Sequence, residues 1–366
     1  MRLSDILKKK YQQQETEVKQ EVQLQKKEKE IVSEPATSAR EEKTLKSYNV
    51  EEVYAKAINT VRNLFRNINS SKTSILVDDV LEVTRSITEI VDVNNQDILL
   101  YSCYSTIDSY IYAHSVNVAI YSGVIGKAKG LPIEDLQELV LCGILHDIGM
   151  AKVLHIAEKK QKITEPEFED IKNHSEYAKE EIGKLQLPAQ LKSKLISVIS
   201  QIHERMDGSG YLKGLEAEQI EFFAKIISIA DIYEAMTHPR PYRDRILPHD
   251  AVVALVKQAQ TELDSQLTKL FIDKISIFPV GSYVKLNTGE IARVIATNSS
   301  FPLRPKVKVI LTAEKYAPKG EEIIDLSQNS QIVITEPVDE TKIDTMDKKL
   351  LLQIRAQRWW VKDSGV

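Results

Sequence analysis

Residues 139–150 read LVLCGILHDIGM, an apolar run that ends in an adjacent histidine and aspartate. Around this run, apolar residues recur at spacings of three and four, which predicts a helix with one face in a hydrophobic core; they are Leu136, Leu139, Val140, Gly143 and Ile144. His146 and Asp147 therefore stand where a buried helix ends. An unpaired carboxylate there would be costly, so the stretch predicts a partner for Asp147.

The same arrangement recurs along the chain. Further polar residues lie in, or directly after, helical stretches: His114, His174, His203 and Asp231. Successive members of the series 114, 146, 174, 203 and 231 are 32, 28, 29 and 28 residues apart. Each separation corresponds to about one helix and one loop. The spacing thus allows successive helix ends to meet at one pocket.

A single histidine at the edge of an apolar helix is more often a core or surface residue, and an acid at a helix end is usually a cap. The repetition favours a metal site instead. Carboxylates and neutral imidazoles suit Mn, Fe, Zn or Ni. Two such cations bridged by Asp147 would make a nucleophile from water at neutral pH.

The predicted fold class is mainly α, a helical bundle with a preceding helical segment and a small C-terminal β module. Residues 282–295 read SYVKLNTGEIARVI, two alternating runs around a turn, which predicts a hairpin. Segments 306–313 and 331–335 also have strand character, and 347–358 predicts a closing helix. The expected parts are a charged tail (1–45), a helical subdomain of unassigned role (46–106) and the helical domain (107–275). The β module (276–338) and a helical C-terminal tail (339–366) follow.

Composition restricts the possible functions. The formal net charge of −4 argues against a nucleic-acid polymer or an anionic membrane as partner. The two cysteines, Cys103 and Cys142, lie in apolar surroundings, so a reducing compartment is expected. No apolar run reaches the ~18 residues of a membrane span, and the first residues lack a signal-peptide core. The sequence predicts a cytoplasmic protein.

These residues resemble a known family. His114, the pair His146-Asp147 and Asp231 match the H…HD…D metal signature of the HD phosphohydrolase superfamily. The stretches 203-HERMDGSGY-211 and 231-DIYEAMTHPRPYR-243 look like the HD-GYP branch, bacterial phosphodiesterases of cyclic di-GMP. The resemblance covers about residues 107–275, and the segment 279–295 is similar to the tail that often follows this domain. It implies a helical HD-type domain with a two-metal site.

The resemblance also implies a role for each matching residue. One metal would be held by His114, His146, Asp147 and Asp231. The second would be held by Asp147, His174 and His203, with Fe or Mn as the expected metals. The substrate would be faced by Tyr211, Arg240 and Arg243. A planar guanidinium binds phosphate oxygens bidentately, which agrees with the arginines; without the family, surface ion pairs explain them equally well.

Five positions depart from the fullest family pattern. Tyr110 stands where members with a third metal have Glu, and Met150 where many have a phosphate-binding Lys. Ile202 replaces the first histidine of a His-His-Glu run, which predicts partial occupancy of the second metal site. Leu212 replaces the proline of Gly-Tyr-Pro, and Glu234 replaces an Asp; both changes look mild. Tyr110 argues against a trinuclear centre.

The resemblance therefore implies metal-dependent hydrolysis of cyclic di-GMP, or a related cyclic dinucleotide, to the linear dinucleotide. Proteins with GGDEF domains are the implied signalling partners. Two alternatives stay open at this point. One is a degenerate module that binds nucleotide or a protein partner without turnover, which the changes at Met150 and Ile202 favour. The other is an HD hydrolase of a different phosphate ester.

Overall fold

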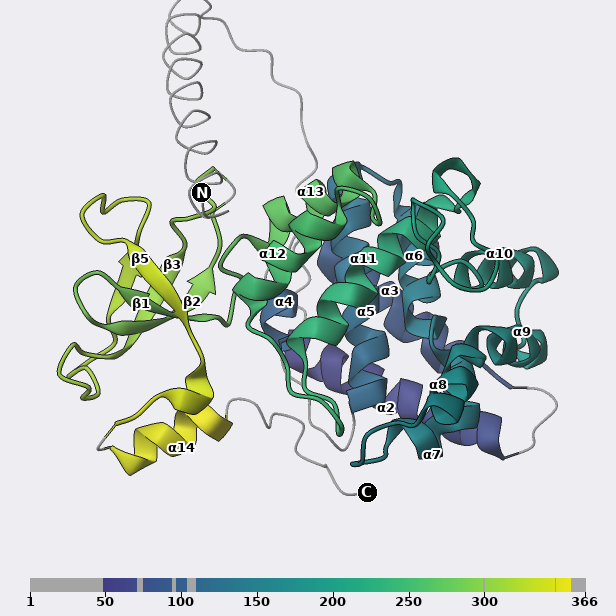
Figure 1. Ribbon diagram of the computed structural model, residues 1–366, viewed down its shortest axis with the longest axis horizontal. Helices are drawn as coiled ribbons and strands as arrows, with labels where there is room; N and C mark the ends of the chain where they lie inside the picture. The colour runs from purple at the N-terminus through teal and green to yellow at the C-terminus, as the bar shows by residue number, and fades with distance from the viewer. Residues whose placement is uncertain are drawn as a thin grey trace, which may run out of the picture. The chain divides into compact units, whose positions relative to one another are not determined.

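The computed structural model describes residues 49–70, 75–93, 97–103, 110–298, 300–345 and 347–356. The predicted N-terminal tail, residues 1–45, lies outside the described residues, as does the end of the C-terminal tail. Within the described part, helices fill the chain up to Ile275 and a small antiparallel sheet follows (Figure 1). The predicted fold class, mainly α with a C-terminal β module, is confirmed.

The first helices are α2 (Val50–Asn69), α3 (Asp78–Asp92), α4 (Asp97–Tyr101), α5 (Tyr110–Lys129) and α6 (Ile133–Leu145). The 3₁₀ helix η2 (Ile148–Val153), α7 (Leu154–Ala157), α8 (Glu165–Lys172), α9 (His174–Lys184) and α10 (Ala189–Ile199) come next. The helical part closes with η3 (Ala217–Gln219), α11 (Phe222–Thr237), α12 (Pro248–Gln258) and α13 (Ser265–Ile275).

Helix α5 is the centre of the helical part (Figure 1). It is buried on nearly every side, as expected for a helix that is apolar all round. Its neighbours are α2, α3, α6, α11 and α13. One hydrophobic cluster joins buried residues from Val50 to Ile275. The described residues of 46–106, predicted as a helical subdomain of unassigned role, therefore contribute to the same core as the helices that follow.

Two glycines let helices approach closely where the polar residues gather. A Cβ on Gly143 of α6 would lie 2.6 Å from the Cα of Ala119 on α5. A Cβ on Gly149 of η2 would lie 1.9 Å from the carbonyl oxygen of His174, at the start of α9. Any larger residue would push these backbones apart. The close contacts bring the ends of α5, α6 and α9 to one place.

The sheet has the order β4-β3-β2-β1-β5 and is antiparallel throughout. The predicted hairpin is formed by β1 (Tyr283–Leu286) and β2 (Ile291–Ala296), and the predicted third strand is β3 (Lys306–Leu311). The fourth, β4 (Ile323–Asp325), was not expected, and β5 (Ile334–Val338) begins three residues later than predicted. After η4 (Glu340–Lys342), α14 (Lys348–Ala356) confirms the closing helix.

One stretch of the described chain, residues 133–157, is apolar and long enough to cross a membrane. It covers α6, η2 and α7, and 83% of its most apolar window is buried inside the protein. Its apolar side chains thus pack against the other helices. This stretch is explained by its place in the core.

Candidate metal centre

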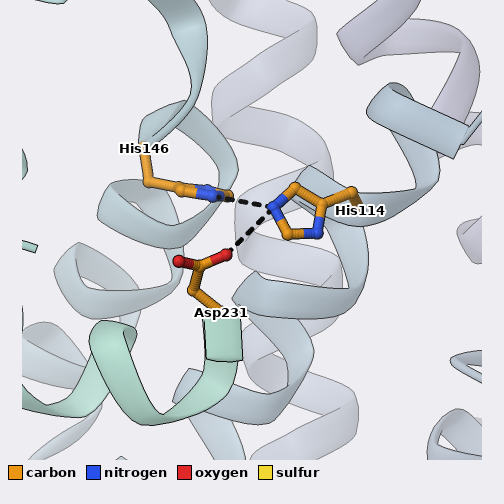
Figure 2. A group of neighbouring side chains, drawn as sticks. All are labelled: His114, His146 and Asp231. Carbon is orange, nitrogen blue, oxygen red and sulfur yellow. Dashed lines mark hydrogen bonds and ion pairs between the residues drawn. The ribbon is translucent and has the colours of Figure 1, made fainter. Parts of the chain in front are cut away.

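Three elements bring the first group of predicted ligands together (Figure 2). His114 lies on α5, His146 directly follows α6, and Asp231 lies on α11. One ligand atom from each lies within 4.8 Å of the others. The Nε2 atom of His114 is 3.2 Å from Nε2 of His146 and 3.3 Å from Oδ1 of Asp231.

The hydrogen bonds of the two imidazoles leave their lone pairs facing each other. His146 donates from Nδ1 to the carbonyl oxygen of Gly143 at 2.7 Å, and His114 donates from Nδ1 to the Glu234 carboxylate. With Nδ1 as the donor, Nε2 is in each ring the nitrogen whose lone pair can bind a cation. Two such nitrogens beside a carboxylate repel one another unless a cation lies between them. The donor set therefore fits a divalent transition metal.

The neighbouring carboxylates also act on the pKa of His114. Burial alone lowers the pKa of His114, but the Glu234, Asp231 and Asp147 carboxylates outweigh this and raise it to about 10. Burial would raise the pKa of Asp231, yet its hydrogen bond with His114 and the neighbouring imidazoles hold it below its usual range. The site thus attracts positive charge strongly.

A second imidazole pair lies on the other side of Asp147. His174 is the first residue of α9 and donates from Nδ1 to the carbonyl oxygen of Ile171 at 2.6 Å. Its Nε2 is 3.0 Å from Nε2 of His203 and 3.4 Å from Oδ1 of Asp147. Burial and the nearby His174 lower the pKa of His203 to about 3, so this ring is neutral. The second pair has the same ligand character as the first.

The carboxylate of Asp147 reaches both pairs. Its Oδ2 is 3.4 Å from Nε2 of His114, and its Oδ1 is 3.6 Å from Nε2 of His146. Burial raises its pKa, but the three neighbouring histidines outweigh burial and lower it, so the carboxylate is ionised. Asp147 is therefore a carboxylate that contacts both imidazole pairs.

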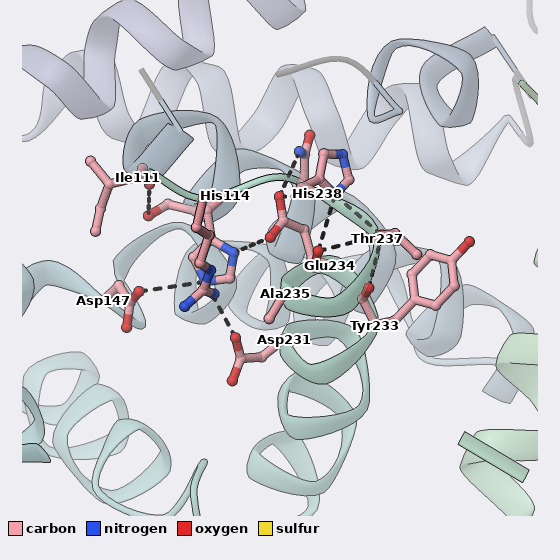
Figure 3. A network of polar contacts seen from close by, with 12 residues as sticks. Ile111, His114, Asp147, Asp231, Tyr233, Glu234, Ala235, Thr237 and His238 are labelled. Carbon is pink, nitrogen blue, oxygen red and sulfur yellow. Dashed lines mark hydrogen bonds and ion pairs between the residues drawn. The ribbon is translucent and has the colours of Figure 1, made fainter. Parts of the chain in front are cut away.

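Glu234 supports this centre, although the sequence indicated only a mild replacement there. It lies one turn after Asp231 on α11 and is 2% exposed. Figure 3 shows its carboxylate between His114 and His238. Besides binding His114, it accepts a hydrogen bond from Asn117 at 3.0 Å and lies 3.3 Å from Nδ1 of His238. A buried acid one turn after a ligand was the signal that could have identified it.

Tyr211 lies against the second imidazole pair. Its ring stacks on that of His203, with centroids 4.8 Å apart and 15° between the planes. The loop that carries it is held by the buried Glu204, which accepts hydrogen bonds from the backbone of Lys213 at 2.8 Å and Leu215 at 3.0 Å. The predicted position of Tyr211 over the pocket agrees with this stacking.

The two predicted phosphate-binding arginines are held differently. The guanidinium of Arg240 is half-buried and lies 6.0 Å from the centre of the Tyr110 ring, with a 3.3 Å hydrogen bond to the hydroxyl of Tyr242. Arg243 is exposed and donates to the carbonyl oxygen of Ala235. Their backbones exchange hydrogen bonds of 2.9 and 3.1 Å, so the two are fixed on one tight turn.

Three of the positions that depart from the family pattern are buried. Tyr110 is 6% exposed and donates its hydroxyl to the carbonyl oxygen of Ala157 at 2.8 Å. Met150 and Ile202 are 7% and 1% exposed and belong to the hydrophobic cluster. All three positions are therefore occupied by side chains with core contacts.

Residues 101–267 match the family described as HD domain, and residues 283–346 match the KOW domain associated with HD domain. The chain is 32% identical over 250 residues to the cyclic di-GMP phosphodiesterase PA4108 of Pseudomonas aeruginosa, covering 66% of this chain and 59% of that protein. It is 29% identical over 246 residues to the cyclic di-GMP phosphodiesterase PdeB of Borreliella burgdorferi, covering 67% and 64%.

A 3'3'-cGAMP-specific phosphodiesterase of Vibrio cholerae, number 3, is 30% identical over 172 residues, which cover 46% of this chain and 36% of that protein. Among solved structures, Bd1817, an HDG"Y"P protein from Bdellovibrio bacteriovorus, is similar with a TM-score of 0.48 and 17% identity, covering 63% of this chain and 74% of that one. The chain spans less than two thirds of the length of the first two curated relatives.

Proposed function

Residues 101–267 match the HD domain family, and from this premise we propose that the chain is a member and a metal-dependent phosphodiesterase of cyclic dinucleotides. One observation carries the proposal. The Nε2 atoms of His114, His146 and His174 lie 3.4 to 3.6 Å from the carboxylate of Asp147, and His203 pairs with His174 at 3.0 Å. Imidazole nitrogens and carboxylate oxygens in this arrangement are suitable ligands for two divalent cations.

The ligand assignment follows from these contacts. The first cation would be held by His114, His146, Asp147 and Asp231, and the second by Asp147, His174 and His203. Bound cations in such a site lower the pKa of water and offset the charge of a phosphate group. Hydrogen bonds from Nδ1 anchor the imidazoles of His114, His146 and His174, so that these ligands keep their orientation. Fe or Mn is the proposed metal, with the second site filled less completely because Ile202 offers no ligand.

The remaining site residues would bind the substrate. Arg240 and Arg243 are proposed to contact the non-bridging oxygens of one phosphodiester, because a guanidinium can bind two oxygens at once. The Tyr110 ring limits the directions that the Arg240 guanidinium can take. Tyr211 would cover His203 and exclude solvent from that side of the pocket. These contacts would hold the phosphodiester for attack in line with the departing 3′-oxygen.

Cyclic di-GMP is the proposed substrate and the linear dinucleotide the proposed product. The names of two relatives give cyclic di-GMP as their substrate, and that of a third gives 3'3'-cGAMP. Tyr110 stands where family members with a third metal have Glu. A site without a third metal supports the linear dinucleotide as the product, with no further cleavage. Proteins with GGDEF domains are proposed as signalling partners, in the cytoplasm.

The test is a turnover assay with defined metal content. Metal-free protein is loaded with Fe²⁺ under reducing conditions or with Mn²⁺, then incubated with cyclic di-GMP, 3'3'-cGAMP and a simple phosphodiester. We expect linear dinucleotide from a cyclic dinucleotide only after loading. Tight binding of cyclic di-GMP without cleavage under either metal would overturn the proposal in favour of a binding module. Cleavage of the simple diester alone would point to a different hydrolase.

A further inference from the structure

A chain of buried hydrogen bonds runs from α2 to His114. The hydroxyl of Tyr54 donates to Oδ1 of Asn117 at 2.8 Å. The amide of Asn117 donates from Nδ2 to Oε1 of Glu234 at 3.0 Å. The other carboxylate oxygen of Glu234 accepts from Nδ1 of His114. Each of these residues is at most 5% exposed.

The side-chain amide of Asn117, in the middle of this series of hydrogen bonds, has only one favourable orientation. With the amide of Asn117 as assigned, its oxygen faces a hydroxyl donor and its nitrogen faces a carboxylate. If the amide were reversed, its oxygen would face the Glu234 carboxylate, two acceptors in a buried place. Tyr54 supplies the donor that fixes this choice. Burial raises the pKa of Tyr54 well above its usual value, so the phenol keeps its proton.

Helix α2 holds Tyr54 firmly. The tyrosine is 5% exposed, and its ring lies 6.1 Å from that of Tyr101 at an angle of 38°. On the same face of α2, Ile58 and Val61 are fully buried in the common core. The phenol is therefore fixed by packing before it meets Asn117.

A second branch reaches Glu234 from residues 97–103. His238 lies 3.3 Å from Oε1 of Glu234 through Nδ1, and its Nε2 donates to the carbonyl oxygen of Ser102 at 2.8 Å. Glu234 is thus held by α5, by the end of α11, and through them by two parts of residues 50–103. This region precedes the residues to which the family resemblance assigns roles.

We propose that Tyr54 is a positioning residue of the first metal site: through Asn117 and Glu234 it fixes the tautomer and direction of the His114 imidazole. The inference rests on the proposed function only in that a metal binds at this site. It gives residues of α2 a role at the centre. Tyr54 itself would contact neither metal nor substrate.

The test compares metal binding by two tyrosine variants of the full chain. Metal-free wild type, Tyr54→Phe and Tyr112→Phe are titrated with Mn²⁺, and free Mn²⁺ is followed by electron paramagnetic resonance. Tyr112 is the matched control, since its ring packs edge-on against Phe65, 5.4 Å away, at the same α2–α5 interface. Losing one buried hydrogen bond predicts affinity about 3- to 10-fold weaker for Tyr54→Phe. Tyr112→Phe should bind as wild type does.

A spectrum and a double variant separate positioning from general loosening. With Co²⁺ in place of Mn²⁺, Tyr54→Phe should change the visible absorption of the bound ion, which reports ligand geometry. In an Asn117→Ala background, Tyr54→Phe should weaken Mn²⁺ binding no further, because the connection is already cut. Thermal unfolding checks that each variant is folded.

The outcomes are distinguishable. Unchanged Mn²⁺ affinity and Co²⁺ spectrum in Tyr54→Phe would overturn the inference and leave the proposed function intact. So would equal losses in both tyrosine variants, or full additivity with Asn117→Ala. Failure of the wild type to bind Mn²⁺ or Co²⁺ at all would overturn the proposed metal centre itself.

Discussion

Asp147 is the residue on which the two halves of the centre depend. Its Oδ2 faces His114 and its Oδ1 faces His174, at 3.4 Å in both cases. Its Oδ1 also lies 3.6 Å from His146, so this carboxylate contacts both imidazole pairs. Without it, Asp231 would be the described carboxylate that still approaches both pairs, at 3.3 Å from His114 and 3.9 Å from His203.

We therefore predict that Asp147→Ala loses both metals and all turnover. The fold should survive, because the change removes an ionised group from a buried place, where its solvation is costly without a cation. Metal content per chain by elemental analysis, with circular dichroism for the helices, checks this. Near-normal metal content in the variant would show that the proposed centre is wrong.

Arg240 tests the substrate side. If it binds a phosphate whose charge grows in the transition state, Arg240→Gln should lower kcat/KM by roughly 30- to 1,000-fold, about 2–4 kcal/mol. Arg240→Lys should recover only part, since an ammonium cannot bind two oxygens in a plane. Single-turnover hydrolysis beside equilibrium binding measures both. A loss of affinity with no wild-type rate to lose would indicate a binding protein.

His114, His146 and Asp231 could be predicted because each lies in or directly after an apolar helix, whereas His174, which follows the polar helix α8 and begins the polar helix α9, was identified by its separation from these residues. For Glu234 the sequence offers only its place one turn after Asp231, since its contacts with Asn117 and His238 depend on the fold. Tyr54 gave no signal at all. It is 63 residues from Asn117 in the chain, and only the packing of α2 on α5 brings them together.

At the scale of elements, the loop of residues 203–215 positions Tyr211. Leu212, next to it, has a φ of 94°, in the left-handed region that side chains rarely adopt. Family members have proline at this position, and proline is restricted to a φ near −65°. The loop therefore follows a path that proline cannot take.

We predict that Leu212→Pro displaces Tyr211 and raises the KM for cyclic dinucleotide, although it restores the family residue. Leu212→Gly should keep the KM and leave stability equal or up to about 1 kcal/mol higher, because glycine adopts a positive φ without strain. Steady-state kinetics and chemical unfolding of both variants measure this. Wild-type kinetics in Leu212→Pro would mean that the loop adjusts freely.

The helices were predicted better than the sheet. Apolar spacing identified α6, and the alternating runs around Asn287 and Gly289 identified the hairpin of β1 and β2. The edge strand β4 has three residues, too few to produce an alternating pattern. Strand β5, at the opposite edge of the sheet, has no fully buried residue, so it carries little hydrophobic signal. Buried helices and strands can be predicted from a sequence because their buried positions are apolar and recur at a regular spacing.

At the scale of the molecule, the sequence suggested a subdomain in residues 46–106 because its helical pattern precedes the recognisable motifs. The structure has one core there. Phe65 of α2 and Phe271 of α13 are 1% and 0% exposed and belong to the same cluster. Both helices pack on α5. If α2 or α13 detached or unfolded, the apolar surface of α5 that it covers would be exposed to solvent.

This predicts one cooperative transition for the helical part. Phe65→Ala and Phe271→Ala should each lower the free energy of unfolding by about 3–5 kcal/mol, a large share of the 5–15 kcal/mol typical of a domain. Both should shift the same transition, seen alike by helical circular dichroism and by release of bound Mn²⁺. Leu76→Ala, at a position 69% exposed, is the control and should stay within about 0.5 kcal/mol of wild type.

The decisive comparison is between the two probes in Phe65→Ala. If α2 were part of a separate unit, its loss would appear as an early drop in helical signal while Mn²⁺ stayed bound. In a shared core, unfolding of α2 uncovers α5 and so releases His114 from its position. Coincident midpoints for both probes are therefore expected. Coincident midpoints would also explain how a residue of α2, such as Tyr54, can influence the metal centre. Helix α2 and the site around His114 would then fold and unfold in one transition.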